Sequence, residues 1–370
     1  MIWQIVSGAA VFSLLIYLYY LFLFGKGLNQ GKDLINYEKP FVSVVIAARN
    51  EEKNINRILT ALVNQSYSKK LYEIIVANDA STDDTVKIVE EFGNKWEQVI
   101  LLNVKNREEA KSPKKNALSQ AIEIAEGEIV MLTDADCLVG NRWIEAMLAN
   151  FDDADMVVGF SRTKLDNWKK SNIAQKFEHF DFLALFFAAA AAISAGKAFS
   201  CSGQNISYRK TAFKSVGGFE KIKHLISGDD VNLMQLFRKA GKKIRFAFSS
   251  PSYAYTQPVS SWKQLISQRS RWASNMKSQI GLNPEFFFYL ISAFLVVILP
   301  IILLFNNFLL AVSIMIIRFL LEINFIKKGL KKFGEEKNKL SFYPLWFILQ
   351  PVYFIVVACL GAFSIFNWKR

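Results

Sequence analysis

Apolar residues are gathered into long blocks at both ends of the chain. Residues 2–24 contain no charged side chain, and a helix of this length, at 1.5 Å per residue, crosses a hydrocarbon layer of about 30 Å. Residues 286–305 and 342–366 have the same character, and residues 308–325 form a shorter block. The pattern predicts four membrane-spanning helices. The first is an uncleaved anchor, because it lacks the basic start and small-residue cleavage site of a secretory signal.

The shortest block, residues 308–325, is the one that carries charge. Arg318 and Glu322 are four residues apart, so they can pair on one face of a helix. A hairpin or a buried helix is the alternative interpretation. A lysine-rich segment follows at residues 327–339, with six Lys against two Glu, and the positive-inside rule places it in the cytoplasm. With four spans, residues 25–285 then lie in the cytoplasm as well.

Short strand-like runs alternate with amphipathic segments in the region after the anchor. A β-branched run at residues 42–47 is followed at residues 55–63 by apolar positions that form one helical stripe. The alternation continues with predicted strands at 73–77, 99–102 and 128–132 and predicted helices at 85–92 and 116–125. This order predicts an α/β fold with a mostly parallel sheet, covered by helices on both faces, that binds ligands at the carboxyl ends of its strands.

Three regions follow from these patterns. We expect an anchor at residues 1–25, a cytoplasmic catalytic domain at residues 26–284, and three spans in residues 285–370. The apolar segment 180–195 lies inside the predicted cytoplasmic domain. It is either a core helix or an interfacial helix that dips into the membrane, and we favour the interface.

The amino-acid composition is consistent with a chain that combines apolar blocks with a globular domain. The chain has 370 residues, of which 52% are hydrophobic and 21% charged, and its formal net charge is +13, so a disordered chain is excluded. Three Cys and two His are too few for a disulfide framework or a His-rich zinc site. A glycine-rich dinucleotide fingerprint and a phosphate-binding loop are both missing after the predicted strands, which argues against a dehydrogenase or an ATPase. We expect no nucleic-acid partner.

Acidic residues follow two of the predicted strands. Asp79 comes after the strand at residues 73–77, and Asp134 and Asp136 come after the strand at residues 128–132. Two carboxylates two residues apart on an extended backbone point the same way and suit a divalent cation bridged to phosphates. A solvated turn or a helix cap is the alternative.

Two further groups carry candidate chemistry. Asp229 and Asp230 open the predicted helix 231–239, where a carboxylate acts either as a general base or as a helix N-terminal charge. Gln268, Arg271 and Trp272 share one helix face, where Arg can clamp a diphosphate and Trp can stack on a sugar. The alternative for this face is a juxtamembrane helix whose side chains contact lipid headgroups.

The order of these motifs resembles a family-2 processive-type glycosyltransferase with a GT-A fold. The match spans roughly residues 41–272 and rests on five segments in sequence: Ala47–Glu52, Asn78–Asp83, Asp134–Asp136, Gly228–Asp230 and Gln268–Trp272. The resemblance implies a nucleotide-sugar donor, with a UDP-sugar expected, and Mg²⁺ or Mn²⁺ on its diphosphate.

The resemblance also implies a role for individual residues. Asp134 and Asp136 would hold the metal, and Asp230, beside Asp229, would be the base. Lys114 would lie near the diphosphate, as part of an element that resembles Gly-Lys-x-x-Ala-Leu. The other implied substrate contacts are Arg49, Asn50, Glu51 and Asp79 for the nucleotide, Gly203 and Asn205 on the acceptor side, and Gln268, Arg271 and Trp272 lining the site.

Three positions depart from the family pattern. Asn78 stands where many members have a first Asp, Asp229 replaces the usual Glu before the base, and Pro113 stands where Gly commonly precedes the Lys. None of these removes a metal ligand or the base. Displacement of a nucleoside diphosphate needs a metal and a base but no covalent nucleophile, so a single displacement would invert the anomeric centre.

The predicted acceptor is a hydroxyl of a membrane lipid. With four spans and the site at the cytoplasmic face of the inner cell membrane, a lipid headgroup is within reach, and the spans offer few polar residues to line a polymer conduit. The Gln-x-x-Arg-Trp motif resembles that of processive synthases, so a secreted polysaccharide is the rival. A membrane scaffold that retains the fold without chemistry is the alternative from another class.

Overall fold

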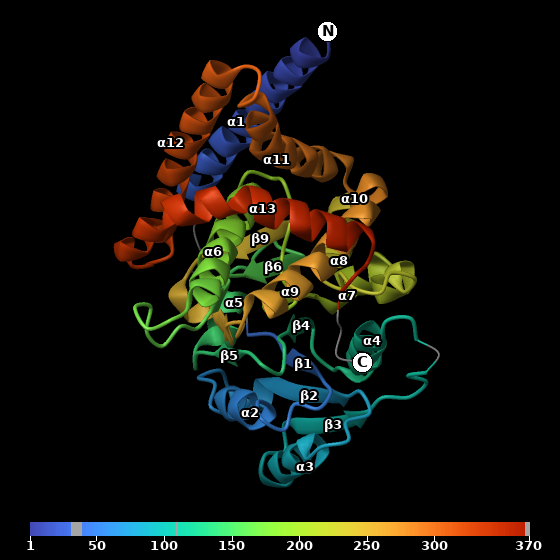
Figure 1. Ribbon diagram of the computed structural model, residues 1–370. Helices are drawn as coiled ribbons and strands as arrows, with labels where there is room; N and C mark the ends of the chain where they lie inside the picture. The colour runs from blue at the N-terminus through green and yellow to red at the C-terminus, as the bar shows by residue number, and fades with distance from the viewer. Residues whose placement is uncertain (31–38, 109, 367–370) are drawn as a thin grey trace. The chain divides into compact units, whose positions relative to one another are not determined.

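The computed structural model describes residues 1–30, 39–108 and 110–366 (Figure 1). Within this part of the chain the contacts define two compact units. We call residues 1–30, 165–199 and 258–366 the helical unit, and residues 39–164 and 200–257 the α/β unit. Each unit is therefore assembled from separate segments of the chain.

The α/β unit is built on a seven-stranded sheet in the order β3-β2-β1-β4-β8-β6-β9. The first four strands in this order are parallel, β8 is antiparallel to both of its neighbours, and β6 and β9 are parallel. The strands are β1 (Val42–Ala48), β2 (Tyr72–Asn78), β3 (Val99–Asn103), β4 (Ile129–Leu132), β6 (Met156–Gly159), β8 (Ile206–Arg209) and β9 (Ile244–Ala247). The predicted α/β fold with a mostly parallel sheet is confirmed.

Helices predicted between the strands are present. They are α2 (Ile55–Val63), α3 (Thr85–Lys95) and α4 (Pro113–Ile124). Helix α4 starts three residues before the predicted position, because Pro113 suits the first turn, where its missing N–H is not needed. The apolar stripe of α2 is completely or almost completely buried against the sheet, as its spacing predicts: Ile55, Ile58, Leu59, Leu62 and Val63.

The remaining strands and helices of the α/β unit are mostly short. A second sheet has the order β5-β10-β7, formed by β5 (Leu138–Val139), β10 (Ala254–Thr256) and β7 (Ser161–Thr163). The remaining elements are η1 (Lys69–Leu71), α5 (Trp143–Leu148), α7 (Lys210–Ser215), η2 (Gly218–Ile222), α8 (Val231–Lys239) and η3 (Ser250–Ser252).

The helical unit contains the long apolar helices. Its elements are α1 (Ile2–Gln30), α6 (Ile173–Ser194), α9 (Trp262–Ser274), α10 (Met276–Leu282), α11 (Pro284–Leu303), α12 (Phe308–Lys332), η4 (Lys337–Phe342) and α13 (Tyr343–Ala362). By length and composition, five described helical stretches could cross a membrane: α1, α6, α11, α12 and Lys337–Ala362. Four of these match the predicted blocks, and α6 is the additional one.

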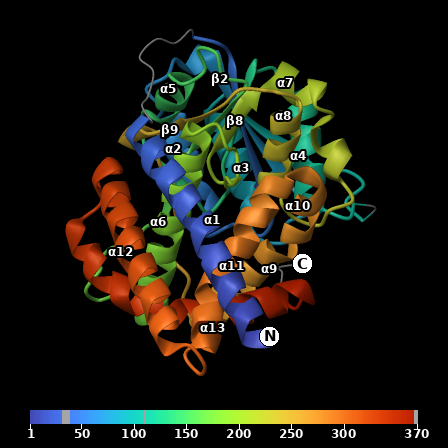
Figure 2. The ribbon, with the colours of Figure 1, turned by 90° about the horizontal axis from the view of Figure 1, so that it is seen from above.

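Helix α6 is the core of the helical unit. It contacts α1, α9, α12 and α13 (Figure 2). Within its most apolar stretch, 78% of the residues are buried. At Gly27 of α1 a Cβ atom would lie 2.0 Å from the carbonyl oxygen of Ala191, so the two backbones touch. This burial supports the alternative of a core helix, because most apolar residues of α6 are covered by neighbouring helices. The position of α6 relative to the membrane stays a prediction.

The predicted pair in α12 is present in a closed polar network. Arg318 Nε lies 2.6 Å from Glu322 Oε1, and the Tyr17 hydroxyl donates to the same oxygen at 2.7 Å. The Tyr343 hydroxyl donates to Glu322 Oε2 at 3.1 Å, and Arg318 donates to Gln350. Because α12 continues for 25 residues, it is one long helix and not a hairpin.

Contacts divide the chain differently from the three predicted regions. Residues 165–199 and 258–284, expected in the cytoplasmic domain, group with the long helices. The boundaries predicted at residues 25 and 285 concern the membrane, and they stay a prediction.

Candidate active site

The loops that follow β1 and β2 are tied together at the carboxyl edge of the sheet. Asn50 has a positive φ of 54°, a conformation that Asn tolerates better than most residues. Its side-chain oxygen accepts a hydrogen bond from the backbone N–H of Thr82 at 2.8 Å, and its own N–H donates to Ser81 Oγ at 3.1 Å. The N–H of Glu51 donates to Thr85 Oγ1 at 2.8 Å. Asn50 and Glu51 therefore fix the shape of the loops predicted to hold the nucleotide.

Asp79 lies buried at the end of β2, opposite an arginine that the sequence analysis did not identify. Arg107 Nε is 2.9 Å from Asp79 Oδ1. Burial raises the pKa of Asp79, and the nearby Arg49 cation opposes this shift. Arg49 Nε is itself buried and has no hydrogen-bond partner in the described chain. Arg107 follows β3, the neighbour of β2 in the sheet, and that adjacency was the signal that could have identified it.

Asp134 and Asp136 form a tight turn after β4. The Cys137 N–H donates to the Asp134 carbonyl at 3.0 Å, and Arg57 Nη2 donates to the Asp136 carbonyl at 2.8 Å. One ligand atom from each of Asp134, Asp136 and Cys137 lies within 4.8 Å of the others. Burial and the negative charge of Asp134 raise the pKa of Asp136 to about 6. A divalent cation would relieve this repulsion, and carboxylate oxygens are ligands that Mg²⁺ and Mn²⁺ accept.

Cys137 is a second residue that the sequence analysis did not identify. Its Sγ lies 3.7 Å from Asp136 Oδ1, close enough for the thiol to donate a hydrogen bond. Burial raises the pKa of Cys137 well above its ordinary value, which favours the thiol over the thiolate. A neutral thiol is a poor metal ligand, since cysteine binds metals as the thiolate. Cys137 therefore acts as a hydrogen-bond donor to the predicted metal ligand.

Lys114 connects the two acidic motifs. Its Nζ lies 2.8 Å from Asp134 Oδ1 and 3.2 Å from Asp229 Oδ2. Burial alone would lower the pKa of Lys114, but the carboxylates of Asp134, Asp229 and Asp230 outweigh it and raise the pKa above its ordinary value. The first turn of α4 thus places a permanent positive charge beside both acidic motifs.

Asp229 and Asp230 are adjacent in sequence but differ in their surroundings. Burial opposes ionisation of both, yet Lys114 holds the pKa of Asp229 below its ordinary value. Burial and the charge of Asp229 raise the pKa of Asp230. Asp230 accepts hydrogen bonds from the N–H groups of Gly203 at 2.8 Å and Val231 at 2.7 Å. Two carboxylates with divergent proton affinities are typical of a site that separates a charge partner from a base.

The predicted acceptor-side residues divide into two kinds. A Cβ atom at Gly203 would lie 3.2 Å from Asp229 Oδ2, so the glycine allows its backbone to approach the acidic pair. Asn205 is fully buried: its oxygen accepts from Trp143 Nε1 at 3.0 Å, and its nitrogen donates to the Phe160 and Ser252 carbonyls at 3.0 and 2.8 Å. With these three bonds made inside the protein, Asn205 holds the segment in place, and the sequence-based assignment of a substrate contact is not supported by its position.

Gln268, Arg271 and Trp272 lie on α9 of the helical unit. Gln268 Oε1 accepts from Arg269 Nη1 at 2.6 Å, and the Arg269 guanidinium lies 4.1 Å from the centre of the Trp272 ring. Arg269 is buried and its Nε lies 3.2 Å from Asp181 Oδ2 on α6. Arg269 occupies an unspecified position of the Gln-x-x-Arg-Trp motif, so the motif gave no signal for this buried ion pair.

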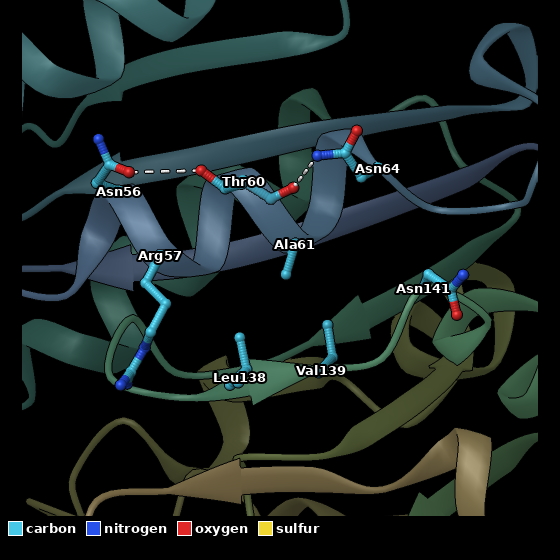
Figure 3. Close-up of a pocket in the computed structure, with 8 residues that line it drawn as sticks. All are labelled: Asn56, Arg57, Thr60, Ala61, Asn64, Leu138, Val139 and Asn141. Carbon is cyan, nitrogen blue, oxygen red and sulfur yellow. Dashed lines mark hydrogen bonds between the residues drawn. The ribbon is translucent and has the colours of Figure 1, made fainter.

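A shallow groove of about 480 Å³ lies between α2 and β5 (Figure 3). Arg57 extends from α2, and its Nη2 donates to the Asp136 carbonyl at 2.8 Å. The groove is lined by Asn56, Arg57, Thr60, Ala61, Asn64, Leu138, Val139 and Asn141. Among the described residues no carboxylate lines the groove, but Arg57 connects its lining to the turn that contains Asp136.

Comparison with known proteins agrees with this geometry. Residues 43–217 match the model of the family described as "Glycosyl transferase family 2". This segment is a family 2 glycosyltransferase domain. Its match includes both Asp134 and Asp136 but ends before Asp229.

Curated relatives of this family 2 glycosyltransferase domain carry glycosyltransferase names. The chain is 26% identical over 208 residues to Glycosyltransferase AglE of Haloferax volcanii, covering 56% of this chain and 64% of the relative. It is 30% identical over 239 residues to the Probable glycosyltransferase YdaM of Bacillus subtilis, covering 64% of this chain and 55% of the relative. The chain thus spans less than two thirds of the length of each.

A solved structure shares the fold. The mannosyltransferase PcManGT from Pyrobaculum calidifontis, in complex with GDP-Man and Mn²⁺, aligns with a TM-score of 0.62 at 18% identity, covering 97% of this chain and 99% of that one. Together with the family match, this likeness identifies the fold of the α/β unit as GT-A.

Proposed function

We propose that this chain transfers a sugar from a nucleotide-diphosphate sugar to a hydroxyl group of a membrane lipid, with inversion at the anomeric carbon. The observation that carries the proposal is the acidic cluster at the carboxyl edge of the sheet. Lys114 bridges Asp134 and Asp229, and Asp230 is fixed beside them by the N–H of Gly203. A cation site, a fixed positive charge and a base are the parts that displacement of a nucleoside diphosphate requires.

Each part has a distinct task in the proposed reaction. Asp134 and Asp136 would hold Mg²⁺ or Mn²⁺, which supplies positive charge to the diphosphate when bound. Lys114 adds a second positive charge on the same side, so the leaving group is stabilised as its bond to the sugar breaks. Asp230, with the higher proton affinity of the acidic pair, takes the proton of the acceptor hydroxyl. The acceptor oxygen then attacks the anomeric carbon directly.

For the donor we propose a UDP-sugar. Asn50 and Glu51 shape the nucleotide loops, Asp79 ends the neighbouring strand, and Arg49 presents a buried Nε without a partner in the described chain. The solved relative PcManGT holds GDP-Man, so the choice of nucleobase is open to direct measurement. Competition between unlabelled UDP and GDP for turnover would decide it.

For the acceptor we propose a lipid in the inner cell membrane, used from the cytoplasmic side. Five described helical stretches are apolar enough to cross a bilayer. The two charged residues within the predicted span 308–325, Arg318 and Glu322, are bonded to each other and to Tyr17, Tyr343 and Gln350, so they offer no free polar path for a glycan. By resemblance, we also propose substrate contacts at Gln268, Arg271 and Trp272. Their motif resembles that of processive synthases, so it favours the rival product, a polysaccharide.

The test is to identify the product. The full chain, purified into lipid nanodiscs, is incubated with Mn²⁺ and a panel of radiolabelled nucleotide sugars, with Asp136→Asn as the inactive control. We expect label of low mass in the organic extract. A water-soluble ladder that grows with time would contradict the lipid acceptor, and an absence of both transfer and metal-dependent donor hydrolysis would support the scaffold alternative.

A further inference from the structure

Lys115, the residue after Lys114, is a buried lysine with no carboxylate partner in the described chain. Its side chain is only 2% exposed. The Nζ donates to the Ile222 carbonyl at 3.0 Å and also to the Leu225 carbonyl. A buried ammonium group is costly unless its donors are satisfied, so the two carbonyls are what makes this position tolerable.

Both carbonyls belong to the segment that leads into the base motif. Element η2 ends at Ile222, and six residues later Gly228 adopts a positive φ of 75° just before Asp229 and Asp230. At the far end of this segment, Asn232 of α8 is fully buried and donates to the Ser227 carbonyl at 3.4 Å. Lys115 therefore holds the start of the segment, and α8 holds its end.

The two neighbouring lysines of α4 have separate tasks. Successive residues on a helix point about 100° apart. Lys114 reaches the carboxylates of Asp134 and Asp229, whereas Lys115 reaches only backbone carbonyls. The first turn of α4 thus contacts Asp134, Asp229 and the segment that precedes Asp229 and Asp230.

We propose that Lys115 is a positioning residue that sets the placement of Asp229 and Asp230. The inference rests on the proposed function, in which Asp230 is the base. Lys115 forms no ion pair with the acidic side chains, although its charge lies near enough to favour the ionised form of Asp229. In the proposed reaction it does not touch the substrate. It acts through the backbone of residues 222–228. A displacement of about 1 Å at a reacting group can cost about 100-fold in rate, so a small movement of this segment is enough to matter.

The first test compares three variants of the full chain. Lys115→Met keeps the length of the side chain and removes its charge, Lys115→Arg restores a cation, and Lys210→Met is the matched control. Lys210 also donates to a backbone carbonyl, that of Ala125 at the opposite end of α4. We expect Lys115→Met to lower kcat by about 10- to 100-fold with the donor KM within twofold. Lys115→Arg should regain part of kcat, and the control should stay within twofold of the wild type.

A second measurement separates positioning from general stability. If Lys115 acts through Asp230, Lys115→Met should cost little further kcat in an Asp230→Asn background, because the placement of an absent base no longer matters. Additive losses would overturn the proposal, and so would a Lys115→Met single variant with wild-type kcat. If Lys115→Met does not fold, the same cycle is run with Lys115→Arg. A wild-type protein without any transfer activity would instead overturn the proposed function.

Discussion

At the scale of single residues, the two carboxylates of the acidic pair have different partners. Asp229 has Lys114 as its charge partner, whereas Asp230 accepts two backbone N–H groups and sits beside the charge of Asp229. Asn at position 230 would keep one oxygen to accept a backbone hydrogen bond. The fold around it should therefore survive the change while its ability to take a proton is lost.

Asp230→Asn should lower kcat by about 100- to 10,000-fold and leave donor affinity nearly unchanged, because only proton removal is lost. Single-turnover kinetics and nucleotide-sugar binding, measured on the same sample, check this. Asp229→Asn is the comparison. If Asp229→Asn proved more damaging to kcat than Asp230→Asn, the base would be the other carboxylate.

Asp136→Asn and chelation of divalent cations should each abolish most turnover, because the diphosphate would lose its charge partner. Exposed Asp152 offers a control, and Asp152→Asn should retain full activity. Since burial and Asp134 raise the pKa of Asp136 to about 6, protons should compete with the cation below that pH. The Mn²⁺ concentration for half-maximal activity should then rise as the pH falls through 6. Full turnover in excess chelator would refute the metal site.

The sequence indicated which acidic residues lie together, but not an arginine and a thiol that lie beside them. Asp134, Asp136, Asp229 and Lys114 are brought together, because motifs that end neighbouring strands or begin adjacent helices converge at one edge of a sheet. Arg107 belongs to no motif and became apparent only from the pairing of β3 with β2. The motif of Asn205 gave no sign of its burial, because that burial depends on partners distant in sequence.

At the scale of elements, α6 and α9 are joined by a buried ion pair. The side chains of Asp181 and Arg269 are 5% and 4% exposed, and the Tyr353 hydroxyl of α13 donates to Asp181 Oδ2 at 3.2 Å. Asp181→Asn should lower the free energy of unfolding by about 3 kcal/mol, because it removes the ion-pair partner of the buried Arg269 charge. Thermal unfolding in detergent measures this.

The control for that change is an exposed pair in the other unit. Lys223 and Glu220 are 69% and 75% exposed, so Glu220→Gln should shift the free energy of unfolding by less than about 1 kcal/mol. Equal effects of the two substitutions would mean that the α6–α9 pair contributes no more than a surface contact.

Helix α1 offers a test of close packing. Gly27→Ala should destabilise the helical unit by about 1–3 kcal/mol, because the added methyl group would collide with the Ala191 carbonyl. Gly8→Ala on the same helix meets nothing within 4 Å and should be neutral or slightly stabilising, since Ala is the better helix former. The comparison of the two unfolding temperatures is the measurement. Identical temperatures would argue against the backbone contact of α1 with α6.

Elements with a strong hydrophobic periodicity were predictable from the sequence. Elements whose position depends on contacts with distant residues were not. The stripe of α2 and the strands of the parallel half of the sheet follow from local pattern alone. The antiparallel pairing of β8 with β4 joins residues far apart in sequence. The burial of α6 likewise depends on helices distant in sequence. An apolar helix has the same sequence pattern whether lipid or protein covers it. The local sequence of residues 180–195 therefore could not distinguish a core helix from an interfacial one.

At the scale of the whole molecule, the predicted topology can be tested by labelling. In a chain depleted of Cys359, Lys337→Cys and Asn306→Cys should react with an impermeant thiol reagent from opposite sides of the membrane, because α12 is predicted to cross it between them. Lys337 is preferable to Gly334, whose positive φ of 67° disfavours a side chain. Asn306 is preferable to Asn307, which caps α12. Labelling of both sites from one side would refute the four-span topology.

The interleaving of the two units has a consequence for the order of events during synthesis. Helix α6 ends at Ser194, but its partners α12 and α13 begin only at Phe308 and Tyr343. A ribosome adding about 5–20 residues per second needs roughly 6–23 seconds to cover the interval before α12. During that time α1 is the only one of these apolar partners already made. The nascent chain is thus most exposed to proteolysis and misinsertion in this interval, and slower translation of residues 195–307 would lengthen it.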